Sequence, residues 1–107
     1  CRTILSTENE TVGCDIPEVN IGSRESVDNF LNLNQPDVII NCAAYTAVDA
    51  CEHEKELSWQ INSDGPKYLA QAAERLKSRL IHISTDYVFD GEKQTAYDED
   101  DSIKVIN

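Results

Sequence analysis

The chain has 107 residues, of which 40% are hydrophobic and 27% charged, and its formal net charge at pH 7 is −11. A chain of this length holds one domain or part of one. The acidic balance argues against nucleic-acid binding, because that affinity comes largely from Lys and Arg neutralising phosphates. No apolar run approaches the ~18 residues of a membrane span and no signal sequence opens the chain, so we expect a cytoplasmic protein without membrane contact.

The first part of the chain predicts short strands followed by an amphipathic helix. Residues 2–6 are expected to close a helix, residues 11–15 to form a short strand and residues 18–21 to form another. Ser23 is a favourable N-cap for a helix over residues 24–33, because its hydroxyl can accept a bond from a free N–H of the first turn.

The second part predicts a strand, a long helix and another strand. Residues 37–41 are continuously apolar through the middle, which is typical of a central parallel strand covered on both faces. A loop over 45–54 with one helical turn at 47–51 leads to helical sequence over 55–77. Pro66 removes a backbone bond and should break or kink this segment, and propensity alone favours two helices with Asp64 as an N-cap. Residues 79–85 form the next strand, parallel to the first, and a loop follows.

Small and polar residues follow both predicted strands. Asn41, Cys42, Ala43 and Ala44 come after the first strand, and Ser84, Thr85 and Asp86 end the second. The carboxyl ends of parallel strands are where open α/β sheets bind ligands. Small side chains there allow a flat ligand such as a dinucleotide to approach the backbone. The cysteines at 14 and 42 are expected to be buried, reduced thiols within their strands.

Two motifs carry a family resemblance. They are Pro36-Asp-Val-Ile-Ile-Asn-Cys-Ala-Ala-Tyr-Thr-Ala-Val-Asp49 and His82-Ile-Ser-Thr-Asp-Tyr-Val-Phe-Asp-Gly91, joined by Asn62, Gly65-Pro66 and Leu69-Ala-Gln-Ala-Ala73. Together they resemble the dTDP-4-dehydrorhamnose reductase family of the extended short-chain dehydrogenase/reductases. The resemblance implies an α/β fold, a Rossmann-like doubly wound parallel sheet truncated at both ends. It implies one long helix over 55–77, kinked near Gly65, instead of two. It also implies hydride transfer from NADH or NADPH to the 4-keto group of a nucleotide-sugar substrate.

The resemblance also implies roles for individual residues. Thr85 matches a hydroxyl that assists proton transfer at the substrate carbonyl, and Asp86 matches a substrate contact; the alternative is that Thr85 caps the strand and Asp86 begins a turn. The expected cofactor contacts are the loop after the first strand, one helix residue and three residues nearer the start of the chain: Ala43, Ala44, Tyr45, Thr46, Asn62, Asp15, Asn20 and Ile21. Asp15 is placed to bind the adenosine ribose, which favours NADH slightly over NADPH.

Two features of the family do not occur in this sequence. No two glycines lie close enough to form a phosphate loop, and no tyrosine has a lysine four residues later. We therefore expect residues 1–107 to be a partial NAD(P)-binding domain that lacks the first strand with its glycine-rich loop and the Tyr-x-x-x-Lys region. Alone it should neither catalyse nor bind dinucleotide tightly. Its unpaired sheet edge is prone to pair with another chain, so a homodimer is one expected state.

Other interpretations of the intact protein remain. One is another nucleotide-sugar reductase, epimerase or dehydratase of the same superfamily. Another is a non-catalytic regulatory subunit similar to the β subunit of methionine adenosyltransferase. A metal site at Cys51-Glu-His-Glu54 is disfavoured, because no second ligand cluster has a recognisable spacing.

Overall fold

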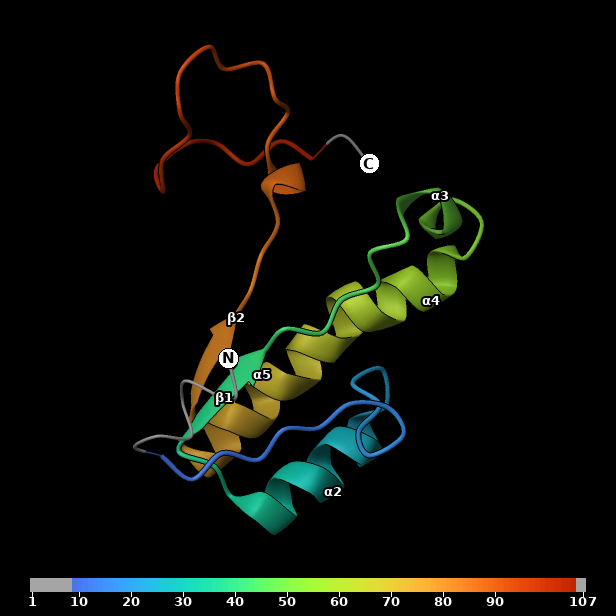
Figure 1. Ribbon diagram of the computed structural model, residues 1–107, viewed down its shortest axis with the longest axis vertical. Helices are drawn as coiled ribbons and strands as arrows, with labels where there is room; N and C mark the ends of the chain where they lie inside the picture. Colours follow the sequence, from blue (N-terminus) through green and yellow to red (C-terminus); the bar gives the residue numbers. More distant parts are fainter. Residues whose placement is uncertain (1–8, 106–107) are drawn as a thin grey trace.

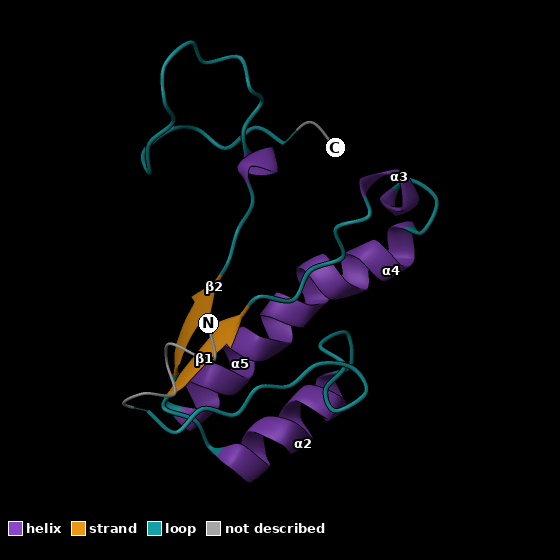
Figure 2. Cartoon of the chain, in the orientation of Figure 1, coloured by secondary structure: helices purple, strands orange, loops and turns teal. Residues whose placement is uncertain are grey.

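The computed structural model describes residues 9–105, so the expected helix end at residues 2–6 lies outside the described residues. The described chain is an α/β arrangement of helices beside a small parallel sheet (Figures 1 and 2). In chain order the elements are α2 (Arg24–Asn34), β1 (Val38–Asn41), α3 (Val48–Cys51), α4 (Lys55–Trp59), the π-helix η1 (Gln60–Asp64), α5 (Gly65–Leu76), β2 (Arg79–His82) and the 3-10 helix η2 (Asp86–Val88).

Helix α2 begins where its local sequence predicts. The Ser23 hydroxyl accepts a hydrogen bond from the backbone N–H of Ser26, as an N-cap does. At the other end Gln35 adopts a left-handed conformation and donates its N–H to the Leu31 carbonyl, which closes the last turn. The predicted bounds are therefore confirmed to within one residue.

Strands β1 and β2 pair in parallel, as the strand–helix–strand order predicts. Val38 lies opposite Arg79 and Asn41 lies opposite His82, so the two strands end together. Within the described residues the sheet has two strands, so the central position expected for 37–41 is not seen there. The face of the sheet away from α2 and α5 leaves Val38, Ile40 and Ile81 about two-fifths exposed.

One continuous helical segment runs from Lys55 to Leu76, and the irregularity expected near Gly65 is a wider turn. Its middle, Gln60–Asp64, is a π-turn in which the Gly65 N–H donates to the carbonyl of Gln60. Pro66 has no N–H and its ring crowds the carbonyl four residues earlier, so a regular α-turn is disfavoured there. The wider turn relieves that crowding and keeps the helix continuous.

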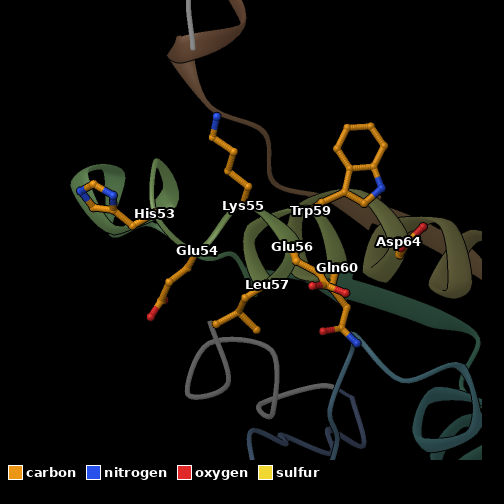
Figure 3. Close-up of a pocket in the computed structure, with 8 residues that line it drawn as sticks. All are labelled: His53, Glu54, Lys55, Glu56, Leu57, Trp59, Gln60 and Asp64. Carbon is orange, nitrogen blue, oxygen red and sulfur yellow. The ribbon is translucent and has the colours of Figure 1, made fainter.

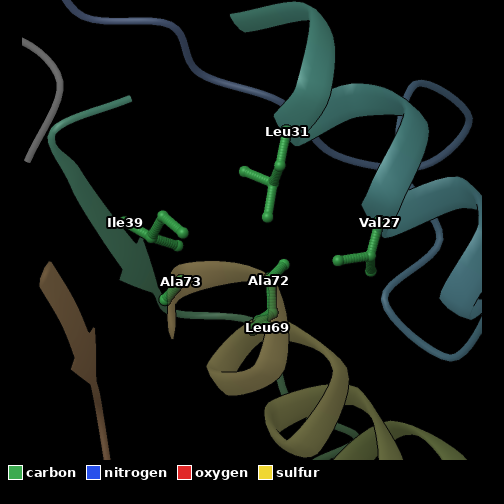
Figure 4. Packing of buried hydrophobic residues seen from close by; sticks show 6 residues of the cluster. All are labelled: Val27, Leu31, Ile39, Leu69, Ala72 and Ala73. Carbon is green, nitrogen blue, oxygen red and sulfur yellow. The ribbon is translucent and has the colours of Figure 1, made fainter. Parts of the chain in front are cut away.

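The core lies between α2, α5 and β1. Figure 4 shows that the side chains of the cluster point toward one another from these elements: Val27, Leu31, Ile39, Leu69, Ala72 and Ala73. Val27 is fully buried. Alanines on the α5 face allow the two helices and the strand to approach closely, so a small number of side chains fills the interior.

Four expectations about the strands are wrong. Residues 11–15 form no strand, residues 18–21 form no strand, and both Cys14 and Cys42 are exposed. A strand needs a neighbour for its backbone bonds, and no described strand lies beside residues 11–15. Strand β2 also ends at His82 rather than 85, because the last residue of β1, Asn41, bonds the Ile83 N–H and there is no β1 residue beyond it in the ladder.

The chain beyond β2 leaves the core and folds on itself (Figure 1). After η2, residues 89–105 contain no helix or strand. This segment is held by the stacked rings of Phe89 and Tyr97, 4.2 Å apart, and by ion pairs that Lys93 and Lys104 make with aspartates. Within residues 9–105, no helix is both long and apolar enough to cross a membrane.

Candidate functional site

The carboxyl ends of β1 and β2 are joined by one buried side chain. Asn41 is 5% exposed, and its Nδ2 lies 3.0 Å from Nδ1 of His82 on the neighbouring strand. Its Oδ1 accepts the N–H of Ala43 at 3.1 Å. The Asn41 side chain therefore fixes the two strand ends through its nitrogen and the turn into the following loop through its oxygen.

The loop after β1 is anchored to the π-turn by Asn62. The Tyr45 N–H donates to Asn62 Oδ1 at 2.8 Å, and Asn62 Nδ2 donates to the Tyr45 carbonyl at 3.0 Å. Ala43, Ala44 and Thr46 are exposed on either side of this anchor. The structure therefore brings together two predicted cofactor contacts, Asn62 and the 43–46 loop, through the backbone of Tyr45.

The Tyr45 side chain is also restrained. Its hydroxyl donates to the Glu54 carboxylate in the connection before α4. This hydrogen bond is the main reason that the pKa of Tyr45 is raised above its ordinary value, with desolvation and the negative charge of Glu54 adding to it. The phenol therefore stays protonated and acts as a hydrogen-bond donor rather than a base.

The two predicted contacts just before α2, Asn20 and Ile21, lie between α2 and the long helix. The side-chain oxygen of Asn20 accepts the Gly22 N–H at 3.0 Å, and the Asn20 N–H donates to the Ser26 hydroxyl. Ile21 lies against Gly65, at the junction of the π-turn and α5, where an added Cβ would meet its side chain at 3.0 Å. This loop is thus shaped by α2 on one side and by the long helix on the other.

Asp15 lies at the beginning of the turn that leads to this loop. Its side chain is exposed, and its Oδ1 accepts the Ile16 N–H at 2.8 Å. The Asp15 carbonyl accepts the Val19 N–H, which closes the turn. The carboxylate is therefore oriented by its own backbone while remaining open to a ligand.

Thr85 and Asp86 are exposed after β2 and interact with each other. The Thr85 hydroxyl donates to Asp86 Oδ1 at 3.3 Å and accepts the Tyr87 N–H, also at 3.3 Å. Thr85 therefore caps η2 and not the strand, which ends at His82, and Asp86 begins the 3-10 turn. Figure 1 shows the segments after β1 and β2 diverging as they leave the sheet.

An open hollow of about 800 Å³ lies at the start of α4, and none of the predicted site residues lines it. Figure 3 shows its lining side chains spreading outward: Lys55 and Trp59 point to one side, and Leu57 and Gln60 to the other. Side chains that diverge cannot converge on one ligand, so we do not assign this hollow a binding role.

Three residues that contribute to the loops were not among the predicted site residues. Asn41 and His82 join the strand ends, and Gln60 bonds the Gly22 carbonyl at 3.1 Å. Asn41 was identifiable as a lone amide ending an apolar run, a position where a buried polar group needs partners. The partner of Gln60 has no signal in the sequence, because Gly22 is far from it along the chain.

These features define a small α/β protein in which one helix organises the loops around the ends of parallel strands. A sequence profile described as the RmlD substrate binding domain matches residues 1–107. The chain therefore belongs to the RmlD substrate binding domain family.

Similar proteins agree with this assignment. The chain is 44% identical over 94 residues to a dTDP-4-dehydrorhamnose reductase of Aggregatibacter actinomycetemcomitans, covering 88% of this chain and 32% of that protein. It is 37% identical over 103 residues to the spore coat polysaccharide biosynthesis protein SpsK of Bacillus subtilis, covering 96% and 36%. The chain thus spans about a third of the length of these curated relatives.

Solved structures share the fold. A dTDP-4-dehydrorhamnose reductase from Clostridium acetobutylicum matches with a TM-score of 0.92 and 41% identity over 97% of this chain and 38% of that one. A second, from Bacillus anthracis in complex with NADP, matches with a TM-score of 0.90 and 36% identity over 94% and 36%. The family resemblance seen in the sequence motifs is confirmed.

Proposed function

We propose that the full-length protein carrying this chain is a dTDP-4-dehydrorhamnose reductase. It would transfer a hydride from NADH or NADPH to the 4-keto group of dTDP-4-dehydro-L-rhamnose in dTDP-L-rhamnose biosynthesis. The observation that carries the proposal is the match at a TM-score of 0.92 and 41% identity to a structure of that name.

The residues of the 43–46 loop fit a dinucleotide. Ala43 and Ala44 are small and exposed, and Asn62 holds the next residue by its backbone, so a flat group can lie against a rigid surface. In this proposal Tyr45 and Thr46 complete the loop's contacts, while Asn20, Ile21 and the carboxylate of Asp15 face the adenosine half. When bound, the nicotinamide supplies the hydride.

Thr85 and Asp86 form the substrate side of the proposed site. The Thr85 hydroxyl now donates to Asp86, and it would turn to donate to the substrate carbonyl as negative charge develops on that oxygen. No tyrosine of this chain has a lysine four residues later, so the proton donor of the family motif must come from elsewhere in the full-length protein.

The proposal extends to the fold and setting. We infer that residues 1–107 are part of a doubly wound NAD(P)-binding domain whose further elements cover the exposed apolar face formed by Val38, Ile40 and Ile81. We further propose that the full-length protein is a cytoplasmic enzyme that acts on a nucleotide sugar and forms a homodimer.

The test is an assay of the purified full-length protein with dTDP-4-dehydro-L-rhamnose, following the loss of NADH and NADPH absorbance. Formation of dTDP-L-rhamnose, identified by mass and by chromatography against a standard, is the expected result. Turnover only with other keto-sugar nucleotides would move the protein to a different reductase of the superfamily. Cofactor binding without turnover of any nucleotide sugar would favour the regulatory-subunit alternative.

A further inference from the structure

The π-turn Gln60–Asp64 holds two loops that are distant in the sequence. On one side Gln60 Nε2 donates to the Gly22 carbonyl at 3.1 Å. On the other side Asn62 makes its paired bonds to the backbone of Tyr45. Figure 1 shows this part of the helix lying between the two connections, and Figure 3 shows Gln60 pointing toward the loop before α2.

Gln60 has a second task in the same turn. Its carbonyl accepts the Gly65 N–H and so closes the π-turn, while its side chain reaches the loop. Residues 60 and 62 are separated by about half a turn of helix, so their side chains point to opposite sides. Gln60 therefore takes part both in the π-turn, through its carbonyl, and in the contact with the 20–22 loop, through its side chain.

Two glycines allow the close approach on the Gln60 side. A Cβ at Gly22 would lie 2.9 Å from Cγ of Gln60, and a Cβ at Gly65 would lie 3.0 Å from Cδ1 of Ile21. Both distances are too short for ordinary packing. The loop over residues 20–22 therefore lies against the helix with little freedom to move, and its position follows that of the π-turn.

We propose that Gln60 is a positioning residue that sets the distance between the 20–22 loop and the 43–46 loop and thereby the affinity for a dinucleotide. The inference rests on the proposed function, in which the two loops contact opposite halves of the cofactor. A ligand that spans both loops depends on their separation, whereas a ligand that contacts only the 43–46 loop does not.

The experiment compares Gln60→Met with wild-type full-length protein. Methionine has a similar length but no donor, so the loop loses its anchor while the helix keeps its volume. We expect KM for NADH to rise about three- to tenfold, which is the effect of one lost hydrogen bond, with kcat unchanged. KM for reduced nicotinamide mononucleotide, which lacks the adenosine half, should stay the same.

Gln71→Met is the matched control. Gln71 lies on the same long helix as Gln60, but its side chain accepts a hydrogen bond from Arg24 of α2 and does not contact the 20–22 loop. It should leave both KM values unchanged. If Gln60→Met does not fold, Gly22→Ala displaces the Gln60 side chain from the opposite side and should reproduce the rise for NADH. Equal effects on the dinucleotide and the mononucleotide, or no effect on either, would overturn the inference.

Hydrogen exchange separates this inference from the proposed function. If wild-type protein uses neither NADH nor NADPH, the proposed function fails, and the anchor is then judged by the exchange rates of the backbone amides at residues 20–23. Faster exchange there in Gln60→Met than in Gln71→Met supports the positioning role. Unchanged exchange contradicts it whatever the activity.

Discussion

Asn62 holds the backbone of Tyr45 through both polar atoms of its side chain. The amide oxygen accepts the Tyr45 N–H and the amide nitrogen donates to the Tyr45 carbonyl. This pair of bonds is equivalent to one rung of a sheet, made by a side chain instead of a second strand. It fixes the loop after β1 to the π-turn, so Asn62 shapes the proposed cofactor surface even before any direct contact.

Replacing Asn62 with alanine should loosen this loop. Two hydrogen bonds are lost at a site that is partly open to water, so we expect the free energy of unfolding to fall by about 1 kcal/mol. Urea denaturation of the full-length protein and faster hydrogen exchange at Tyr45 measure the effect. Asn34→Ala is the control, because Asn34 bonds only the carbonyl of Phe30 within α2. An equal change in both variants would remove the anchoring role from Asn62.

Replacing Thr85 with valine should slow the reduction. The substitution keeps the shape but removes the hydroxyl proposed to stabilise charge on the substrate oxygen, so kcat should fall roughly ten- to a hundredfold. Thr85→Ser should retain most of the activity. Thr95→Val, at an exposed threonine in the segment beyond η2, controls for the loss of a surface hydroxyl. Full activity in Thr85→Val would leave Thr85 only its observed role as a cap.

Neutralising Asp15 should shift the choice of cofactor. In the proposed site this exposed carboxylate lies beside the ribose, where it would repel the additional phosphate of NADPH by about 1 kcal/mol. Asp15→Asn should therefore raise the ratio of kcat/KM for NADPH to that for NADH about fivefold. The neighbouring exposed acid gives a matched control, Glu18→Gln, which should not change the ratio. Wild-type protein with a large NADPH preference would contradict the role of Asp15.

Acid should loosen the segment beyond η2 before the core. The pKa of Asp90 is lowered from 3.8 to about 2, first by the hydrogen bond from the Glu92 N–H and then by Lys104 and the Tyr97 hydroxyl. Because the folded-state pKa is below the unfolded one, the stabilisation is present above pH 3.8 and is lost as the pH falls toward about 2. NMR shifts of the Tyr97 ring, near Asp90, should follow this change.

The titration has an internal comparison. Asp90→Asn should remove the acid transition of Tyr97, because an amide does not ionise, and it should leave the segment looser at neutral pH. Asp100→Asn, at an exposed aspartate of the same segment, should retain the transition. A Tyr97 transition that is unchanged in Asp90→Asn would show that another group controls this segment.

Truncating the core should cost far more than truncating the surface of the same helix. Leu31 is 6% exposed between α2, β1 and α5, whereas Leu33 is 84% exposed. Leu31→Ala should lower the free energy of unfolding by about 3 kcal/mol, through lost burial and the cavity left behind. Leu33→Ala should change it by less than about 0.5 kcal/mol. Similar losses measured by urea denaturation would contradict the described core.

The long helix shows where prediction from the sequence reached its limit. The spacing of apolar residues from Leu57 to Leu76 indicated helical sequence, and Pro66 indicated an irregularity near Gly65. The choice of one helix over two came from the family resemblance. Whether that irregularity became a break, a kink or a wider turn could not be read from the sequence. The π-turn is consistent with packing on both sides, where Gln60, Asn62 and Gly65 contact the two loops.

The candidate site divides in the same way. The sequence placed small and polar residues after two parallel strands, and the structure has both strands and both loops. It could not pair Asn62 with Tyr45 or Asn41 with His82, because a side-chain amide carries no information about which distant backbone or ring it will meet. The expected strand at 11–15 failed for a related reason, since a strand exists only with a neighbour.

The sequence by itself determined the α2 cap at Ser23, the order of strand, helix and strand, their parallel pairing and the family. These depend on bonds within one turn, on the period of apolar residues and on the fixed hand of the crossover. Only the tertiary structure decided the π-turn, the anchoring of the two loops and the diverging course of the segments after β1 and β2. Each of these requires groups from distant parts of the chain to meet, and their meeting is set by how the helices and strands pack.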